Sequence, residues 1–200
     1  MLIVFGGLPG TGKSTVARLV AAQIRGAWLR VDLIEQAMRD AGMPDPGPAG
    51  YMAAYALAEA NLRLGLPVVA DSVNPLPVTR DAWRRAAGSH PLLEVELICS
   101  DPSEHRRRVE TRSTDIPGLV PPSWDAVWRR DYALWPARHL VIDTATMTAE
   151  EAAARISAEA GWPAHPPHAP PPPASAAGGG APARRLGRGA GSAARPRSSG

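Results

Sequence analysis

The sequence of 200 residues contains one cysteine, one phenylalanine, one lysine and no long apolar run. A disulfide needs two cysteines, so a single Cys99 excludes a disulfide within the chain. The apolar neighbours of Cys99 predict a buried thiol rather than a nucleophile. The apolar run at residues 2–5 is too short for a signal peptide, and no stretch approaches the roughly 20 apolar residues that cross a bilayer. We therefore expect a cytoplasmic protein that makes no membrane contact.

Positive charge is also scarce in most of the chain. Of the 22 basic residues, five lie beyond Gly161, where there is no acidic residue. Residues 1–161 therefore contain 17 basic and 19 acidic side chains, a net charge of −2. Residues 162–200 are rich in Pro, Ala, Gly and Arg, a composition that predicts a disordered tail. We expect one domain at residues 1–161. The tail's charge suits any polyanion, so nucleic acid is an open but not a favoured partner.

Short apolar runs alternate with helical patterns along residues 1–161. The expected strands are residues 2–5, 27–31, 68–70, 92–98 and 140–142. The expected helices are residues 13–24, 33–41, 51–64, 79–87, 102–112, 123–134 and 149–160. Strands that alternate with helices predict an α/β three-layer sandwich, in which a parallel sheet has helices on both faces.

A phosphate-binding pattern follows the first expected strand. The residues are Gly7, Leu8, Pro9, Gly10, Thr11, Gly12, Lys13, Ser14 and Thr15, which match the Walker A sequence G-x-x-x-x-G-K-[ST]. Glycines let backbone N–H groups approach phosphate oxygens, and the following helix points its positive end at them. Lys13, the only lysine, is expected to reach the β- and γ-phosphates, Ser14 to hold Mg²⁺, and Thr15 to bind a further oxygen. A Rossmann loop is excluded because G-x-G-x-x-G is not present.

Two aspartates are expected at the carboxyl edge of the sheet, where α/β proteins place their sites. Asp71 ends the third expected strand and is the candidate for organising Mg²⁺; the alternative is a turn residue before Asn74. Asp32 ends the second expected strand and is the candidate base for an acceptor hydroxyl. Its alternative is an ordinary N-cap of the following helix. Arg30 would grip an anionic substrate group or lie solvated at the strand end.

A basic helix followed by a proline-rich loop is expected to form a lid. Arg108 and Arg112 share one face of this helix, where they would stabilise charge on a transferring phosphoryl group. Arg112 is the first candidate and Arg108 the second. Arg106 and Arg107 are expected to form a solvated face.

These motifs resemble the small P-loop kinases of the nucleoside-monophosphate-kinase type, grouped with zeta toxin, chloramphenicol phosphotransferase and polynucleotide kinase. The segment at residues 31–35 looks like the one that carries the catalytic aspartate of chloramphenicol phosphotransferase, which implies that Asp32 is the base. Asp71, Asn74, Arg80 and Trp83 look like a D-x-x-N…R…W stretch of the same group. Residues near Thr144 are implied to line the adenine.

The resemblance covers roughly residues 1–160 and implies a five-stranded sheet in the order 2-3-1-4-5. It also implies an ATP- and Mg²⁺-dependent kinase, monomeric or dimeric, that phosphorylates a hydroxyl of a small molecule. Two alternatives stay open. One is a nucleic-acid 5′-hydroxyl kinase that uses the tail as a tether, and the other is a nucleotide-binding module without catalysis.

Overall fold

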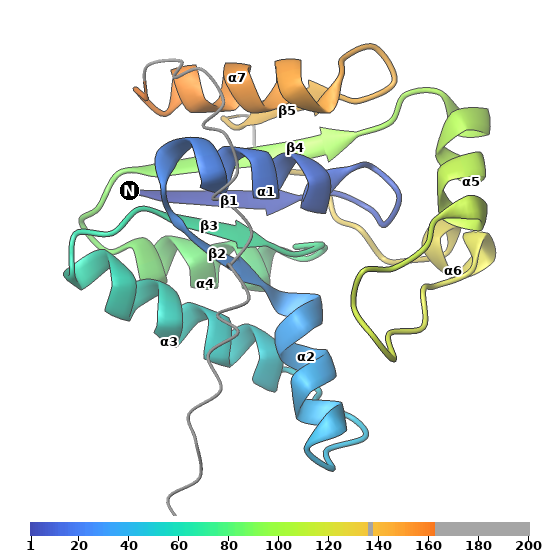
Figure 1. Cartoon of the computed structure of the whole chain (residues 1–200), viewed down its shortest axis with the longest axis horizontal. Helices are drawn as coiled ribbons and strands as arrows, with labels where there is room; N and C mark the ends of the chain where they lie inside the picture. Colours follow the sequence, from blue (N-terminus) through green and yellow to red (C-terminus); the bar gives the residue numbers. More distant parts are fainter. Residues whose placement is uncertain (136–137, 163–200) are drawn as a thin grey trace, which may run out of the picture. The chain divides into compact units, whose positions relative to one another are not determined.

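Five parallel strands form the central sheet of the computed structural model, which describes residues 1–135 and 138–162. The strands are β1 (Leu2–Gly6), β2 (Ala27–Arg30), β3 (Val68–Asp71), β4 (Leu92–Ile98) and β5 (Leu140–Asp143). Their order is β2-β3-β1-β4-β5, which confirms the expected order (Figure 1). Helices on both faces complete the expected three-layer α/β sandwich.

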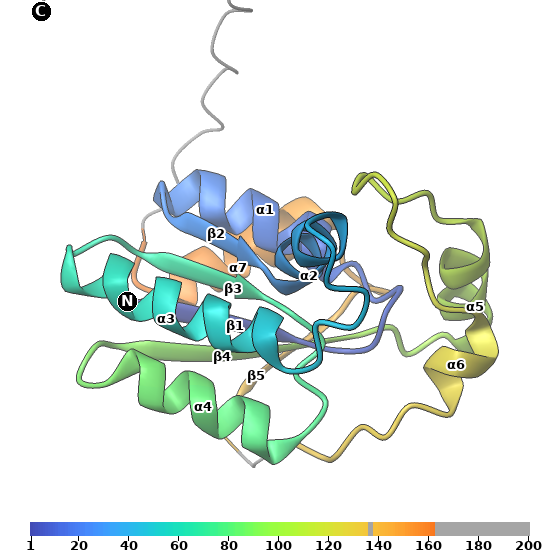
Figure 2. The same cartoon turned by 90° about the horizontal axis from the view of Figure 1, so that it is seen from below.

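Two pairs of helices cover the sheet (Figures 1 and 2). The helices α1 (Lys13–Ile24) and α7 (Ala149–Glu159) cover one face, and α3 (Ala49–Arg63) and α4 (Pro77–Ala87) cover the other. The central strand β1 serves both cores. Ile3 and Phe5 pack with α1 and α7, while Leu2 and Val4 pack with α3 and α4, and all four are 0% exposed. This burial on both faces explains the continuous apolar run.

The remaining helices lie at the carboxyl end of the sheet, with α5 and α6 beyond the strand ends in Figure 1. They are α2 (Val31–Asp40), α5 (Pro102–Thr111) and α6 (Trp124–Trp128). The start of α2 corrects the sequence expectation, because β2 ends at Arg30 and Asp32 lies in the first helical turn. The extended residue Arg30 is the N-cap, so the alternative of Asp32 as an N-cap is wrong. An acid in the first turn complements the helix dipole instead.

Helix α6 is much shorter than the expected helix at residues 123–134. The backbone after it is held by Arg80, whose guanidinium donates to the carbonyls of Leu134 at 2.8 Å and Ala133 at 2.6 Å. Trp135 then packs against Gly6, where a Cβ atom would collide with its ring. The backbone that leads from α6 back to the sheet therefore has hydrogen-bond partners that are not part of a helix. The same contacts fix the end of the lid against β1.

The predicted tail at residues 162–200 lies outside the described residues except for Trp162. That side chain packs against the core formed by α1 and α7, one residue beyond the expected domain boundary. In the part of the chain that the structure describes, we find no helix with both the length and the apolarity to span a membrane.

Candidate active site

The loop between β1 and α1 is built around three glycines with positive φ. The φ angles are 131° at Gly7, 89° at Gly10 and 84° at Gly12, a region that residues with a side chain rarely adopt. Space is limited as well, because a Cβ atom at Gly10 would lie 2.5 Å from Val109 of α5. The Gly7 N–H donates to the carbonyl of Val73 at 3.1 Å, which ties the loop to the turn after β3.

Lys13 begins α1 and lies inside this loop. Its side chain is buried, and its Nζ donates to the carbonyl of Leu8 at 2.8 Å. Burial lowers the pKa of Lys13 to about 8, although the carboxylates of Asp71 and Asp32 act in the opposite direction. The loop therefore encloses an amine, and a bound phosphate would raise the pKa of this amine and favour its charged form.

Asp71 ends β3 beside Phe5 of β1 and Arg30 of β2. It is 3% exposed, and burial raises its pKa, whereas Lys13 and the Ser14 hydroxyl favour its charged form. Among the described residues no hydrogen-bond partner reaches its Oδ2 atom, and the Nε atom of Arg30 lies 3.9 Å away. A buried carboxylate oxygen in this state, next to a serine hydroxyl, fits a water-bound Mg²⁺.

The described residues offer no group of three His, Cys, Asp or Glu side chains that could cage a metal. Beside nucleotides, Mg²⁺ is usually held through one or two protein oxygens, waters and the phosphates of the substrate. Ser14 and Asp71 would be those two protein ligands.

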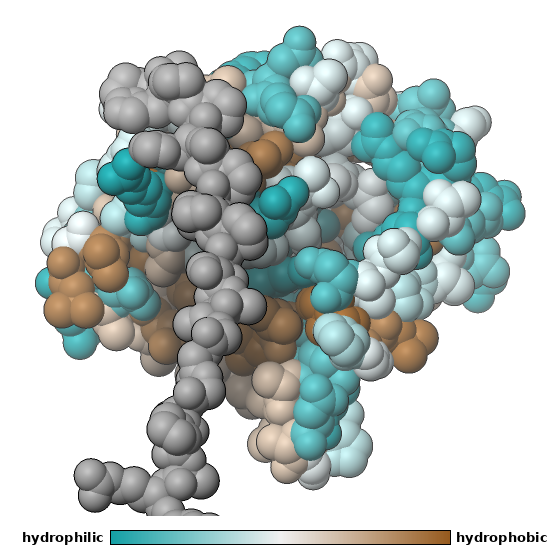
Figure 3. Space-filling view, viewed as in Figure 1, coloured by the Kyte–Doolittle hydropathy of each residue, from teal (hydrophilic) through white to brown (hydrophobic). Residues whose placement is uncertain are grey.

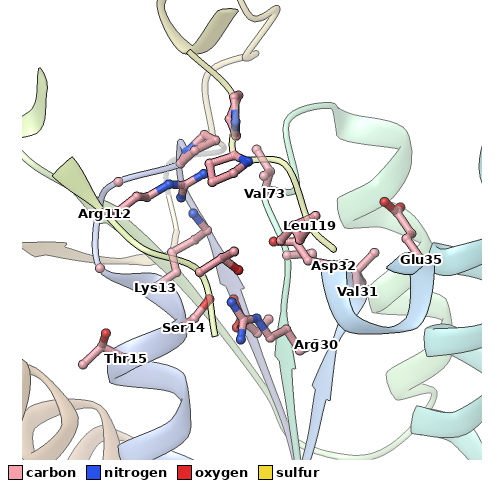
Figure 4. A pocket seen from close by; sticks show the side chains of 18 of the residues that line it. Lys13, Ser14, Thr15, Arg30, Val31, Asp32, Glu35, Val73, Arg112 and Leu119 are labelled. Atoms are coloured by element: carbon pink, nitrogen blue, oxygen red, sulfur yellow. The ribbon is translucent and has the colours of Figure 1, made fainter. Parts of the chain in front are cut away.

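A cavity of about 390 Å³ brings the candidate residues together. Its lining includes Lys13, Ser14 and Thr15 of α1, Asp32 and Glu35 of α2, Tyr51 of α3, Asp71, and the arginines Arg108, Arg112 and Arg130. In Figure 4, Lys13 and Arg112 approach the space from one side and Asp32 from the other. Asp32 is exposed to this space. The structure thus assembles residues from six separate segments of the sequence.

The two lid arginines differ in what they contact. Arg108 donates to the hydroxyl of Thr144 at 2.8 Å and to its carbonyl at 3.0 Å, and its Nε atom donates to Glu104. The Thr144 hydroxyl in turn donates to the carbonyl of Thr11 at 3.1 Å. Arg108 therefore connects α5 to the end of β5 and to the phosphate loop. Both arginines line the cavity, and Figure 4 shows Arg112 pointing into it.

The outer face of α5 is hydrophilic, as Figure 3 shows for the surface over this helix. Arg106 and Arg107 are exposed and pair with Glu110 and Glu104, so the expectation of a solvated face is confirmed. On its inner face, the His105 Nε2 atom lies 2.8 Å from the carbonyl oxygen of Pro9. No local sequence pattern indicates this contact between lid and phosphate loop.

Arg30 is occupied by the chain's own acids. It donates to both carboxylate oxygens of Asp115, at 2.7 and 2.9 Å, and lies near Asp71. Asp115 belongs to the loop that follows α5, and the Nη1 atom of Arg30 donates to both of its oxygens, so this charge-assisted pair docks the lid loop onto the end of β2. The Arg30 side chain is 12% exposed, so the alternative of a solvated arginine is wrong. Its guanidinium pairs with a carboxylate of the protein itself.

The residues that resemble D-x-x-N…R…W form a buried support beneath the site. Asn74 has a φ of 50°, donates to the carbonyl of Phe5 at 2.6 Å and accepts from the indole N–H of Trp83 at 2.9 Å. Arg80 donates to the Asn74 carbonyl at 2.9 Å. This network holds the turn after Asp71 against β1, so Asn74, Arg80 and Trp83 position the site without entering it.

The fold, the glycine-rich loop and the lysine at the start of α1 define a P-loop NTPase. Residues 2–120 match a family described as an AAA domain, and the chain belongs to this family. It is also 35% identical over 113 residues to uncharacterized proteins of Mycobacterium tuberculosis and Mycobacterium bovis. That match spans 50% of this chain and 23% of each relative, so the chain corresponds to about a quarter of those proteins.

Solved structures with the same fold include several kinases. A sugar kinase from Janibacter matches with a TM-score of 0.58 and 20% identity, over 78% of this chain and 92% of that one. A gluconokinase from Sinorhizobium meliloti matches with 0.54 and 21%, over 79% and 94%. An APS kinase from Mycobacterium tuberculosis in complex with AMPPNP and APS matches with 0.52 and 20%, over 78% and 94%. At these identities the likeness shows the P-loop kinase fold.

Proposed function

We propose that this chain is an ATP-dependent kinase that transfers the γ-phosphate of ATP to a hydroxyl of a small molecule. The observation that carries the proposal is the convergence of Lys13, Asp32, Asp71 and Arg112 on one cavity. A phosphate-binding loop alone would suit any NTPase. A carboxylate facing that loop across the cavity supplies what phosphoryl transfer to an alcohol needs in addition.

Each residue has a role that its position supports. The loop N–H groups and Lys13 would hold the β- and γ-phosphates, with Ser14 and Asp71 as the ligands of Mg²⁺, which when bound neutralises phosphate charge. Asp32 would accept the proton of the attacking hydroxyl. Arg112 would approach the transferring phosphoryl group from the lid, and Arg108 would hold the lid helix in register with the loop.

The test of this proposal uses γ-labelled ATP, the purified chain and a small-molecule extract of bacterial cells. We expect the label to move to an acceptor in a Mg²⁺-dependent manner. Binding of ATP without labelling of any compound would favour the nucleotide-binding module instead. A 5′-hydroxyl oligonucleotide is offered in parallel, and labelling confined to it would favour the nucleic-acid kinase.

Replacing Asp71 with asparagine is expected to remove the advantage that Mg²⁺ gives to ATP binding. The substitution keeps the size of the side chain but removes the charge that would face the hydrated ion. In a titration calorimeter, the wild-type chain should bind ATP more tightly with Mg²⁺ than with EDTA, whereas Asp71→Asn should show about the same affinity in both. A Mg²⁺ effect of wild-type size in the variant would remove Asp71 from the metal site.

The lowered pKa of Lys13 predicts that ATP binding depends on pH. Because the charged amine binds phosphate, affinity should be full well below a pKa of about 8 and fall as the pH rises through it. Each further pH unit should weaken binding about tenfold. Fluorescence titrations between pH 7.5 and 9.5 measure this slope. The variant Lys13→Arg keeps its charge throughout and should show no such slope, and a flat profile in the wild type would contradict the prediction.

A further inference from the structure

The acceptor end of the cavity contains a second carboxylate that the proposed mechanism does not use. Glu35 lies three residues after Asp32, so the two side chains share one face of α2, and both line the cavity. Figure 4 shows both on the side away from Lys13 and Arg112. From this pair we infer that the acceptor is a hydroxyl compound without an anionic group, whose recognised end donates hydrogen bonds to Asp32 and Glu35.

Glu35 is held in place by its surroundings. Its side chain is 20% exposed and packs against Gly50 at the start of α3, where a Cβ atom would collide with it. Its Oε2 atom accepts from Arg39 at 3.3 Å. Burial and the neighbouring Asp32 raise the pKa of Glu35. The chain therefore keeps a carboxyl group at a place where desolvation and repulsion by Asp32 both disfavour its charge. That cost suits a binding residue better than a solvated one.

The cations near the acceptor end are already balanced. Arg30 is bound to Asp115 and lies near Asp71, and Arg39 is bound to Glu35. Arg112 interacts with both ends, because its charge lowers the pKa of Lys13 while Asp32 favours the charged form of Arg112. Arg130 acts on the pKa values of both Lys13 and Glu35, so it lies between the phosphate and acceptor ends. An anionic acceptor would have to lie against Asp32 and Glu35, and it would share Arg112 and Arg130 with the phosphates of ATP.

The other lining groups of this end are uncharged. Tyr51 and Ser72 supply hydroxyls, and Val73 and Leu119 supply apolar surface beside Asp32. Hydroxyls and carboxylates around a small apolar patch suit a polyol, a sugar or an amino alcohol, all of which carry several donors. A sugar acid or an oligonucleotide brings negative charge to the carboxylates. The inference rests on the proposed function, since it names the class of acceptor for that site.

The experiment separates a small-molecule extract of bacterial cells by ion exchange at neutral pH into anionic, neutral and cationic fractions. Each fraction is offered to the full chain with γ-labelled ATP and Mg²⁺. We expect the highest labelling in the neutral fraction if the donors are hydroxyls, or in the cationic fraction if they include an ammonium group. Highest labelling in the anionic fraction would overturn the inference while leaving the kinase proposal intact. If no fraction is labelled although ATP binds, the kinase proposal fails and the inference fails with it.

A matched pair of variants tests the role of Glu35. Glu35→Gln removes a carboxylate from an (i, i+4) pair with Arg39, and Glu59→Gln does the same on α3, in the pair with Arg63, away from the cavity. With the labelled fraction as acceptor, Glu35→Gln should raise the KM for the acceptor about tenfold or more and leave the KM for ATP within about twofold. Glu59→Gln should change neither. An unchanged acceptor KM in Glu35→Gln would overturn the assignment, and the ATP KM reports whether the variant is folded.

Discussion

The variant Lys13→Met is expected to lose phosphoryl transfer by about a hundred- to a thousandfold, the effect of removing one preorganised donor from a developing charge. Lys13 is the cation that α1 places inside the phosphate loop, and its side chain is 7% exposed. Methionine fills a similar space without charge, so the loop should keep its conformation. Single-turnover transfer from γ-labelled ATP measures the loss without interference from product release.

The control for Lys13→Met removes a positive charge elsewhere. Arg155 lies on the exposed side of α7 and does not line the cavity. Arg155→Met should therefore transfer phosphate at the wild-type rate and unfold at a similar temperature. If Lys13→Met retained activity within about tenfold of the wild type, the loop would bind phosphate through its backbone alone, and the role assigned to this lysine would be wrong.

The part of the chain around β1 and α1 was predictable because local and tertiary requirements agree there. A strand buried on both faces must be apolar throughout, as at residues 2–5, and a loop with three positive φ angles must carry glycine at those places. Asp71 was predictable for the same reason, since the end of a parallel strand next to β1 lies beside the phosphate loop. In these positions the sequence pattern and the fold impose the same residue types.

The lid was less predictable because long-range contacts decide its conformation. The helical pattern at residues 123–134 continues past Trp128, where α6 ends. The carbonyls of Ala133 and Leu134 instead accept hydrogen bonds from Arg80, about fifty residues earlier in the chain. Arg108 likewise has the spacing of a residue that faces the substrate, yet it is bound to Thr144. No local pattern reveals either partner.

Glu35 shows a different limit of the sequence. It is one of several acids on an amphipathic helix, and spacing places it beside Asp32 without showing that α3 packs against it. Because Gly50 packs against the Glu35 side chain, this glutamate is held in place in the lining of the cavity. Its candidate role therefore became visible only with the tertiary structure.

Asp32→Asn is expected to lower phosphoryl transfer by about a hundred- to ten-thousandfold, the usual contribution of a positioned general base. The variant should bind ATP as the wild type does, because Asp32 lies across the cavity from the phosphate loop (Figure 4). ATP affinity from calorimetry and single-turnover transfer on the same preparation separate the two effects. Since Asp32 is exposed to the cavity and is not the N-cap of α2, the fold should be unaffected.

The matched control for Asp32→Asn lies in the lid. Asp125 occupies the second position of α6, as Asp32 does in α2, and it is exposed outside the cavity. Asp125→Asn therefore removes the same charge from the same place in a helix, together with a dipole contribution of about 0.3–1 kcal/mol. It should transfer phosphate normally. Full turnover by Asp32→Asn would show that the acceptor hydroxyl loses its proton to another group. Glu35 is the nearest carboxyl on the same helix face. In that case Glu35→Gln would be expected to lower the rate as well as raise the acceptor KM.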